Sequence, residues 1–344
     1  MSAGRDLNHK RVTITEVARA AAVSVGTVSH VLNDKPVVAQ ATRQRVLAVA
    51  HDLGFSPDAI GRALSLGRTR TIALCGPIAT NLSISGNIHA ASQCADQAGY
   101  GLVCCSTDNN PERELAIVKM LIAQRVAAVI THGAIPSPAP YQRLLDAGIP
   151  VVFTRHRPPG LLADLVVSDY YDGTLRAVRH LLAIGRKRIA ILVGAIREEP
   201  AKARVAAYRR AHAEADVPLR DELLRFDLHN SATGDAAADN LLDLLRPPDA
   251  IVAGVGDLTL GALSCMRRRR IAVPHHIAFV GTGDLPWAQL MNPSLTMIEV
   301  SGQEIGRRSV ELALARLSSR QRESPPEDVY LPVNFVVRES TAAF

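Results

Sequence analysis

The stretch that decides the fold of the N-terminal region is TITEVARAAAVSVGTVSHVLN, residues 13–33. Its first four residues, Thr13-Ile14-Thr15-Glu16, form a capping-box pattern, which predicts a helix running to about Ala21. Ser24 repeats the N-cap signal and predicts a second helix over Val25–Leu32. Two short helices joined by so tight a turn must cross at a steep angle. This is the helix-turn-helix arrangement, whose second helix can enter the major groove of DNA.

A third helix is expected over about Gln40–Leu53, where apolar residues recur at helical spacing. Gly54 is placed to end this helix, with Phe55 as the hydrophobic partner of the helix end. The three helices together offer enough apolar side chains for one small core. Its candidate residues are Val17, Ala18, Val28, Val31, Leu32, Val46, Val49, Ala50 and Leu53.

The positive charge of the chain is concentrated at its N-terminal end. The 344 residues carry a formal net charge of +6. Residues 1–70 contain ten basic and five acidic side chains, so about a fifth of the chain has a net charge of +5. A cationic segment attached to a nearly neutral remainder is typical of a module that binds a polyanion such as nucleic acid. An ordinary solvated surface is the alternative.

The segment that follows the third helix combines helix-start signals with features of a linker. Ser56 is placed as an N-cap and Pro57 as a first-turn proline, which predicts a helix over 57–64. Such a helix is well below the ~12–15 residues that an isolated helix needs in water, and Gly61 weakens it further. We therefore expect this segment to fold only when a partner packs against it. A plain linker is the alternative interpretation.

From Thr71 onward, short apolar runs alternate with amphipathic stretches, which predicts α/β lobes built on parallel sheets with helices on both faces. A hydrophobic content of 47% supports large packed cores. Strands are expected over 72–75, 102–105, 127–131, 150–153, 188–193, 249–253, 277–280 and 295–299. Helices are expected over 88–98, 112–125, 174–184, 203–215, 236–245, 258–268 and 303–317.

Many residues of the N-terminal region occur at a fixed spacing that is specific to one family. The pattern is Thr13-Ile14-x-x-Val17-Ala18-x-x-Ala21-x-Val23-Ser24-x-x-Thr27-Val28-Ser29-x-Val31-Leu32-Asn33. Further matching segments lie at 42–46, 53–57, 69–74, 185–190, 248–251, 260–263 and 337–341. Through these residues the chain resembles the LacI/GalR family of transcriptional regulators over nearly its whole length.

The resemblance implies an α/β protein with three regions. They are an N-terminal all-α helix-turn-helix head at 1–55, a hinge helix and linker at 56–70, and an effector-binding and dimerisation body at 71–344. The family's body is similar to periplasmic sugar-binding proteins, in which two lobes with parallel sheets enclose a ligand cleft. We expect the chain to cross between the lobes near Val167, Met297 and Glu323. The N-lobe would then comprise about 71–167 and 298–323, and the C-lobe about 168–297 and 324–344.

The resemblance also assigns the contacts with DNA. In the second helix, His30 can donate a hydrogen bond to guanine, and Val25 can contact a thymine methyl group. The polar neighbours of these residues suit phosphate contacts, which position the protein without reading sequence. In the hinge helix, Leu64 would wedge between base pairs of the minor groove. The implied major-groove residues are Val25, Gly26, Thr27, Ser29, His30 and Asn33. The implied minor-groove residues are Ala59, Ile60, Arg62 and Leu64.

A ligand cleft is implied between the lobes, but its residues depart from the family pattern. Gly256 and Gly283 stand where the family commonly has Asn and Asp, so hydroxyl acceptors are lost. The loss of these acceptors disfavours a plain sugar effector. The alternatives are a ligand of different polarity and no ligand at all. Asp172 can be either a cleft residue or the cap of the helix that follows it. The candidate effector-binding residues are Asn81, Asp172, Arg204, His229 and Asp284.

Enzyme motifs and metal ligands are not found in the sequence. Gly254-x-Gly256 and Gly281-x-Gly283 follow expected strands, but both lack the third glycine of a dinucleotide fingerprint. No GxSxG, HExxH or GxxxxGK[ST] motif occurs. The five cysteines form no CxxC pair and are interpreted as small core residues. We therefore expect neither a cofactor nor a metal.

Two classes of function follow from these patterns. The first is a homodimeric repressor that binds a palindromic double-stranded DNA operator and holds a small effector, such as a sugar, a nucleoside or a related metabolite. The second, supported only by the fold, is an α/β sugar- or nucleotide-binding enzyme with a basic appendage. Neither a signal peptide nor a run of ~20 apolar residues is visible, so we expect a cytoplasmic protein without membrane contact. The chain shows no heptad tail after Thr341, which favours a dimer.

Overall fold

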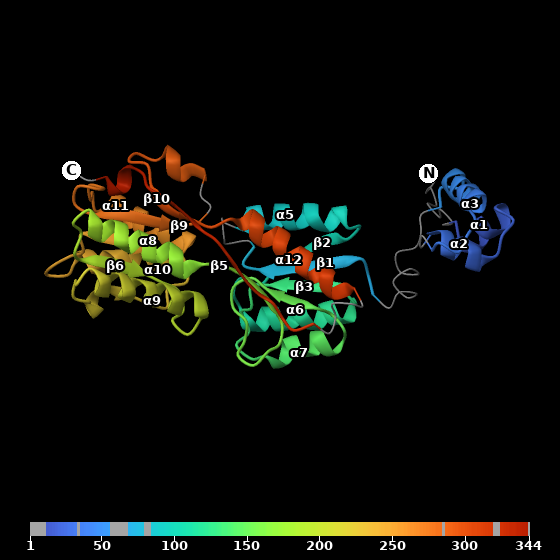
Figure 1. Ribbon diagram of the computed structural model, residues 1–344, viewed down its shortest axis with the longest axis horizontal. Helices are drawn as coiled ribbons and strands as arrows, with labels where there is room; N and C mark the ends of the chain where they lie inside the picture. Colours follow the sequence, from blue (N-terminus) through green and yellow to red (C-terminus); the bar gives the residue numbers. More distant parts are fainter. Residues whose placement is uncertain are drawn as a thin grey trace, which may run out of the picture. The chain divides into compact units, whose positions relative to one another are not determined.

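The computed structural model describes residues 12–32, 35–55, 68–78, 84–283, 286–318 and 324–342. The chain divides into two compact units, Met1–Thr69 and Arg70–Phe344, which we call the head and the body. The described residues of the head form three helices, whereas the body contains two β-sheets with helices on both faces (Figure 1). This arrangement confirms the expected fold class.

The head consists of α1 (Ile14–Ala20), α2 (Val25–Leu32) and α3 (Gln40–Asp52). These helices pack around one apolar core, as the sequence predicts. The end of α3 is also as expected, because Gly54 adopts a φ of 62° and the Phe55 N–H donates to the Ala50 carbonyl at 2.8 Å. Leu53 was expected in the core but is 40% exposed. The buried core residues are Val17, Ala18, Ala21, Val28, Val31, Val46 and Ala50.

The first sheet of the body defines the N-lobe and has six strands in the order β11-β5-β4-β3-β1-β2, all parallel. Helices α5 and α12 cover one face of this sheet, and α6 and α7 cover the other (Figure 1). The strands are β1 (Thr71–Gly76), β2 (Gly101–Ser106), β3 (Ala128–Thr131), β4 (Val151–Phe153), β5 (Asp164–Ser168) and β11 (Asp328–Leu331). The helices are α5 (Ile84–Gln97), α6 (Pro111–Ala123), α7 (Ala139–Asp146) and α12 (Gly302–Leu317).

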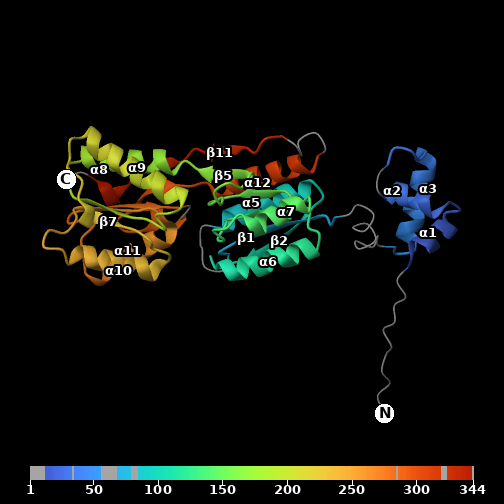
Figure 2. The ribbon, with the colours of Figure 1, turned by 90° about the horizontal axis from the view of Figure 1, so that it is seen from below.

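The second sheet defines the C-lobe and has six strands in the order β12-β10-β9-β8-β6-β7, with only the β10–β12 pair antiparallel. Helices α8 and α9 cover one face, and α10 and α11 cover the other (Figure 2). The strands are β6 (Ile189–Leu192), β7 (Leu224–Arg225), β8 (Ala250–Ala253), β9 (Ala278–Thr282), β10 (Thr296–Glu299) and β12 (Asn334–Val336). The α-helices are α8 (Tyr170–Ala183), α9 (Glu199–Glu214), α10 (Ser231–Leu242) and α11 (Gly256–Arg268).

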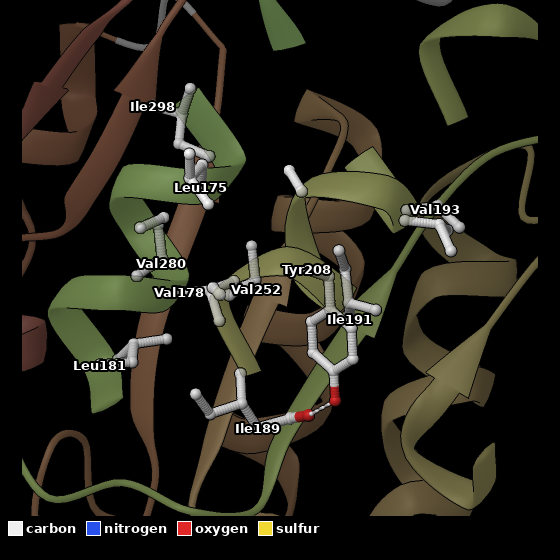
Figure 3. Packing of buried hydrophobic residues seen from close by; sticks show 14 of the residues in the cluster. Leu175, Val178, Leu181, Ile189, Ile191, Val193, Tyr208, Val252, Val280 and Ile298 are labelled. Carbon is white, nitrogen blue, oxygen red and sulfur yellow. Dashed lines mark hydrogen bonds between the residues drawn. The ribbon is translucent and has the colours of Figure 1, made fainter. Parts of the chain in front are cut away.

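The central strands of both lobes are buried on both faces, because helices cover each side of a parallel sheet. In β6, Ile189 and Ile191 face the core beneath α8 and α9, whereas Leu192 faces the core beneath α10 and α11. Figure 3 shows the first of these cores, where the Tyr208 hydroxyl donates to the Ile189 carbonyl at 2.8 Å. This bond satisfies the one polar atom of an otherwise apolar, fully buried side chain.

The connections between the lobes differ from expectation at one point. The chain passes from the N-lobe sheet to the C-lobe sheet after Ser168, and returns after Glu299. The third crossing was expected at Glu323, but β11 still pairs with β5 in the N-lobe sheet. The crossing therefore lies between Leu331 and Asn334, and the expected assignment of 324–331 to the C-lobe is wrong. The reason is that β11 is a half-exposed edge strand, so it lacks the continuous apolar run of a central strand.

The remaining secondary structure agrees with the sequence analysis except for short or edge elements. All eight expected strands and all seven expected helices are present. Helix α7 and strands β5, β7, β11 and β12 were not predicted. Of the cysteines, Cys75 and Cys265 are buried as expected, whereas Cys104 is exposed on the edge strand β2, where its interpretation as a core residue is wrong.

None of the helices in the described ranges combines the length and the apolar character needed to cross a membrane.

Candidate DNA-binding and effector-binding sites

Local side-chain hydrogen bonds set the start of both helices of the helix-turn-helix. At α1, the Thr13 backbone N–H donates to Glu16 Oε2 at 2.7 Å, and the Glu16 N–H donates to Thr13 Oγ1, which confirms the capping box. At α2, the Ser24 Oγ accepts a hydrogen bond from the Thr27 N–H at 3.0 Å. Between the helices, Ala22 adopts a φ of 53°, which reverses the chain within a few residues.

Helix α2 presents one face to the head core and the opposite face to solvent. Val28 and Val31 are buried in the core. Val25, Gly26, Ser29 and His30 occupy the other side of the helix at i, i+4 spacing, and Val25 is 42% exposed. An exposed apolar side chain at the start of such a helix is suited to a thymine methyl group. The described part of the candidate major-groove surface consists of the exposed Val25 and Gly26 and the half-buried Thr27, Ser29 and His30.

The C-terminal end of α2 is held by a side chain from α3. The Arg43 guanidinium donates to the Lys35 carbonyl at 2.6 Å and to the Val31 carbonyl at 3.5 Å. Because these carbonyls lie at and just beyond the end of α2, Arg43 fixes the orientation of the exposed face. Arg43 is therefore a positioning residue that the analysis of charge alone did not distinguish from other basic residues.

A cavity of about 130 Å³ lies in the body, where the carboxyl ends of strands from both sheets meet. Ligands of α/β proteins commonly bind in the crevice outside the carboxyl ends of parallel strands. The N-lobe contributes residues that follow or end β3 and β4, and the C-lobe contributes residues that follow or end β6, β8 and β9. The polar residues and glycines of these strand ends are His132, Thr154, Arg155, Gly194, Gly254, Thr282 and Gly283.

Arg204 of α9 is the candidate effector residue that the structure places at the cavity. Its side chain is buried, with 6% of the residue exposed. The guanidinium donates to the Pro200 carbonyl at 3.0 Å and lies 3.9 Å from the centroid of the Tyr170 ring. Burial lowers the pKa of Arg204 to about 10, with a smaller effect of Arg155 in the same direction, so the group is still a cation at neutral pH.

A second cation at the cavity has a carboxylate partner. Arg155 follows β4, and its guanidinium lies 2.9 Å from the Glu198 carboxylate in the C-lobe. Both side chains line the cavity, so this ion pair joins the two lobes across it. Asp257, in the first turn of α11, is half-buried near Arg155. Burial raises the pKa of Asp257, and the charge of Arg155 opposes this effect.

Polar atoms without a partner gather at the cavity. Four buried side-chain nitrogen or oxygen atoms in the described residues lack a hydrogen bond, and three of them belong to residues that line the cavity. They are Asn87 Oδ1, His132 Nδ1 and Thr282 Oγ1. Asn87 and Thr282 are only 4% and 3% exposed. Because leaving a buried polar atom unpaired costs about 1–3 kcal/mol, their concentration here indicates a place where a polar molecule binds.

A buried network fixes the loop that carries His132. The carboxylate of Glu114 accepts hydrogen bonds from Thr131 Oγ1 at 2.5 Å, from the Ala134 N–H at 2.6 Å and from the Tyr141 hydroxyl at 2.9 Å. These bonds hold the chain on both sides of His132. Burial, with a smaller effect of the charge on Arg155, lowers the pKa of His132 to about 3. The imidazole is therefore neutral at physiological pH.

The low pKa of His132 predicts a loss of stability in mild acid. Because the pKa falls from 6.5 in the unfolded chain to about 3 in the folded chain, the unfolded state binds more protons between these values. Stability should therefore rise with pH across this window. Between pH 7 and pH 5.5, His132 should contribute a decrease of about 1 kcal/mol in the free energy of unfolding.

Urea unfolding of His132→Gln at the two pH values measures this contribution. The variant should lose less stability than the wild type on acidification, whereas the control His89→Gln, at an exposed position in α5, should match the wild type. Equal losses in wild type and His132→Gln would contradict the prediction.

The other described effector candidates do not line the cavity. Helix α8 begins at Tyr170, four residues earlier than expected, so Asp169 is its N-cap and Asp172 lies in its first turn. The Asp172 carboxylate lies 2.9 Å from Arg176 on the same helix. His229 is exposed just before α10, and its backbone N–H donates to Thr233 Oγ1 at 3.0 Å. Neither residue is among the described residues that line the cavity.

Several candidates lie outside the described residues. These are Asn33, Ala59, Ile60, Arg62, Leu64, Asn81 and Asp284.

Sequence reasoning missed most of the cavity. Asn87, His132, Arg155, Tyr170 and Thr282 were not candidates, although all of them line it. The only feature of the sequence that could have indicated these residues is their place relative to the expected strands and helices. Most of them directly follow or end a strand, or lie in the first turns of a helix. That signal is weak in an α/β chain, because every strand has such an end and only the packed sheets show which ends converge.

Comparisons with known proteins cover nearly the whole chain. The family description "Bacterial regulatory proteins, lacI family" matches residues 13–58, and "Periplasmic binding protein-like domain" matches residues 178–341. The HTH-type transcriptional regulator DegA of Bacillus subtilis (strain 168) is 30% identical over 335 residues, which is 96% of this chain and 98% of DegA. The HTH-type transcriptional repressor PurR of Vibrio campbellii is 29% identical over 313 residues, which is 90% of this chain and 93% of PurR.

The fold is also that of a solved repressor. The crystal structure of the lac repressor dimer bound to operator and the anti-inducer ONPF matches with a TM-score of 0.80 at 26% identity, over 97% of this chain and 100% of that chain. A helix-turn-helix head joined to a periplasmic-binding-protein-like body defines the chain as a DNA-binding transcriptional regulator. Its identity to DegA over nearly the full length of both proteins shows that it belongs to the lacI family of bacterial regulatory proteins. The alternative of an enzyme with a basic appendage is therefore wrong.

Proposed function

We propose that this regulator is a homodimer that represses transcription by binding a palindromic operator, and that a small effector in the body cavity changes its affinity for that operator. The observation that carries the proposal is the cavity, which both lobes line and where buried polar atoms lack partners. A ligand that satisfies those atoms contacts both lobes and so favours one arrangement of them over another.

The proposed homodimer is supported by the free edge of the N-lobe sheet. Strand β2 lies at this edge, and all six of its residues are exposed or half-buried. Val103 of β2 and Met120 of α6 are 36% and 40% exposed. An open strand edge with apolar side chains invites pairing with another surface, and a twofold dimer would cover it on both copies. Two heads related by such an axis would read the two halves of a palindrome.

The proposed contacts with DNA follow from the exposed face of α2. Val25, Gly26 and His30 are the base-reading candidates, and Thr27 and Ser29 the candidates for phosphate contacts. Asn33 and the hinge residues Ala59, Ile60, Arg62 and Leu64 stay in the proposal on sequence grounds.

The proposal is tested by selecting binding sites for the purified full chain from random duplex DNA. We expect a palindromic consensus, bound about 10³-fold or more tightly than random DNA at physiological salt. The logarithm of the affinity should fall linearly with the logarithm of the salt concentration, because phosphate contacts release counterions. Salt-dependent binding without any sequence preference would contradict the proposed repressor.

The variant His30→Ala tests the base-reading role in the same selection. The consensus should lose its preference at one base pair in each half-site, with about 1–3 kcal/mol less discrimination there. A uniform loss of affinity for all sequences would instead identify His30 as a phosphate contact.

A further inference from the structure

The charges around the body cavity do not balance. Arg204 is a buried cation whose described partners, the Pro200 carbonyl and the Tyr170 ring, are both neutral. In the described part of the chain, no carboxylate lies within 4.0 Å of its guanidinium. Buried charges in proteins are normally paired, because desolvation of an unpaired ion costs several kcal/mol.

The carboxylates near the cavity act mainly on the other cation, and of the groups that shift the pKa of Arg204, Glu198 has the smallest effect. Glu198 forms the 2.9 Å ion pair with Arg155. The charge that acts on the half-buried Asp257 is also that of Arg155. Arg204 thus keeps a positive charge that no described side chain neutralises directly.

The backbone around the cavity adds to the positive potential. The cavity is lined by the first residue of each of four helices, α5, α8, α11 and α12. It is also lined by Pro200, the second residue of α9. The N-terminus of a helix carries partial positive charge and favours anions. The space for the Arg204 side chain is kept open by Gly254, where a Cβ atom would lie 2.9 Å from Arg204 Cδ and 2.9 Å from the Leu192 carbonyl oxygen.

We propose that the effector is a small hydroxylated organic anion, whose carboxylate or phosphate group binds Arg204. Guanidinium groups hold such anions by paired, charge-assisted hydrogen bonds. The hydroxyl groups of the ligand would satisfy the buried Asn87 Oδ1 and Thr282 Oγ1, which lack a partner and belong to residues that line the cavity. This inference rests on the proposed function, since it names the chemistry of the effector that the cavity takes.

Thermal unfolding of the full chain with matched compounds tests the charge of the ligand. The pairs are gluconate and sorbitol, glucuronate and glucose, and glucose 6-phosphate and glucose, so that carboxylate and phosphate are examined separately. We expect the acidic member of a pair to raise the melting temperature, and its neutral partner to bind about tenfold or more weakly in titration calorimetry. A neutral member that stabilises the protein as well as its acidic partner would overturn the proposal.

The variant Arg204→Met tests the same inference without any ligand. Removing an uncompensated buried charge should leave the melting temperature of the ligand-free protein unchanged or raise it. The acidic compounds should lose their advantage over the neutral ones in this variant. The control Arg209→Met, at an exposed position in the same helix, should behave as the wild type in both respects. If the ligand-free Arg204→Met variant melts well below the wild type, the proposal is overturned. This result counts even if none of the compounds changes the melting temperature of the wild type.

Operator titrations separate this inference from the proposed function. An acidic compound that binds through Arg204 but leaves operator affinity unchanged would support the ligand class and contradict the proposed regulation. A neutral compound that binds the wild type and changes operator affinity would support regulation and overturn the ligand class.

Discussion

Asp164→Ala should lower the free energy of unfolding of the body by about 3–5 kcal/mol, because it removes the buried carboxylate that pairs with the buried Arg316. The Asp164 and Arg316 side chains are only 4% and 10% exposed, and two hydrogen bonds of 2.7 and 2.9 Å join them. Asp164 also accepts from the Glu327 N–H at 2.8 Å, just before β11. The pair therefore holds α12, β5 and the approach to β11 together.

A double-mutant cycle measured by urea unfolding checks this prediction. Asp164→Ala combined with Arg316→Met should recover much of the loss, since no unpaired charge is then buried. The control is Asp328→Ala, which breaks the more exposed pair with Arg157, where the nearest nitrogen–oxygen distance is 2.6 Å and the side chains are 39% and 24% exposed. That change should cost about 0–1 kcal/mol. Equal losses for Asp164→Ala and Asp328→Ala would contradict the prediction.

Gly306→Ala should also destabilise the body, by about 3 kcal/mol, through a backbone clash. A Cβ atom at Gly306 would lie 2.2 Å from the Asn87 carbonyl oxygen and 3.0 Å from the Ala91 nitrogen. Both atoms belong to the backbone of α5, so α5 and α12 would have to move apart. Because Asn87 lines the cavity, the same displacement should weaken effector binding.

Thermal unfolding and ligand titration of Gly306→Ala check this expectation together. The control Gln303→Ala lies at an exposed position on the same helix and should change stability by no more than about 0.5 kcal/mol. A melting temperature equal to that of the wild type would show that the helix contact is looser than the structure has it.

The head could be predicted almost completely because its signals are local. The capping box at Thr13, the cap at Ser24 and the helix end at Gly54 each involve residues no more than a few positions apart. The structure confirms all three, together with the bounds of α2. Only the exposure of Leu53 differs: Leu53 is the C-cap just past the last residue of α3, where helical spacing no longer decides burial.

The fold class of the body could be predicted from the sequence, but the points where the chain crosses between the lobes could be predicted less well. Central strands such as β1, β3 and β8 are buried on both faces, and their continuous apolar runs mark them in the sequence. Strands β11 and β12 lie at sheet edges and are half-exposed, so their sequences lack such runs. The third crossing was misplaced for this reason.

The amino-acid order alone thus specified the helix-turn-helix, the alternation of strands and helices, and the family, since these depend on neighbouring residues and on fixed spacing. The composition of the cavity required the folded body. Asn87, His132 and Thr282 are far apart along the chain, and only the pairing and packing of two sheets bring their unpaired polar atoms to one place. Likewise, the loops that surround Arg204 come from distant parts of the chain. The spacing of residues along the sequence therefore does not show whether Arg204 has a carboxylate partner.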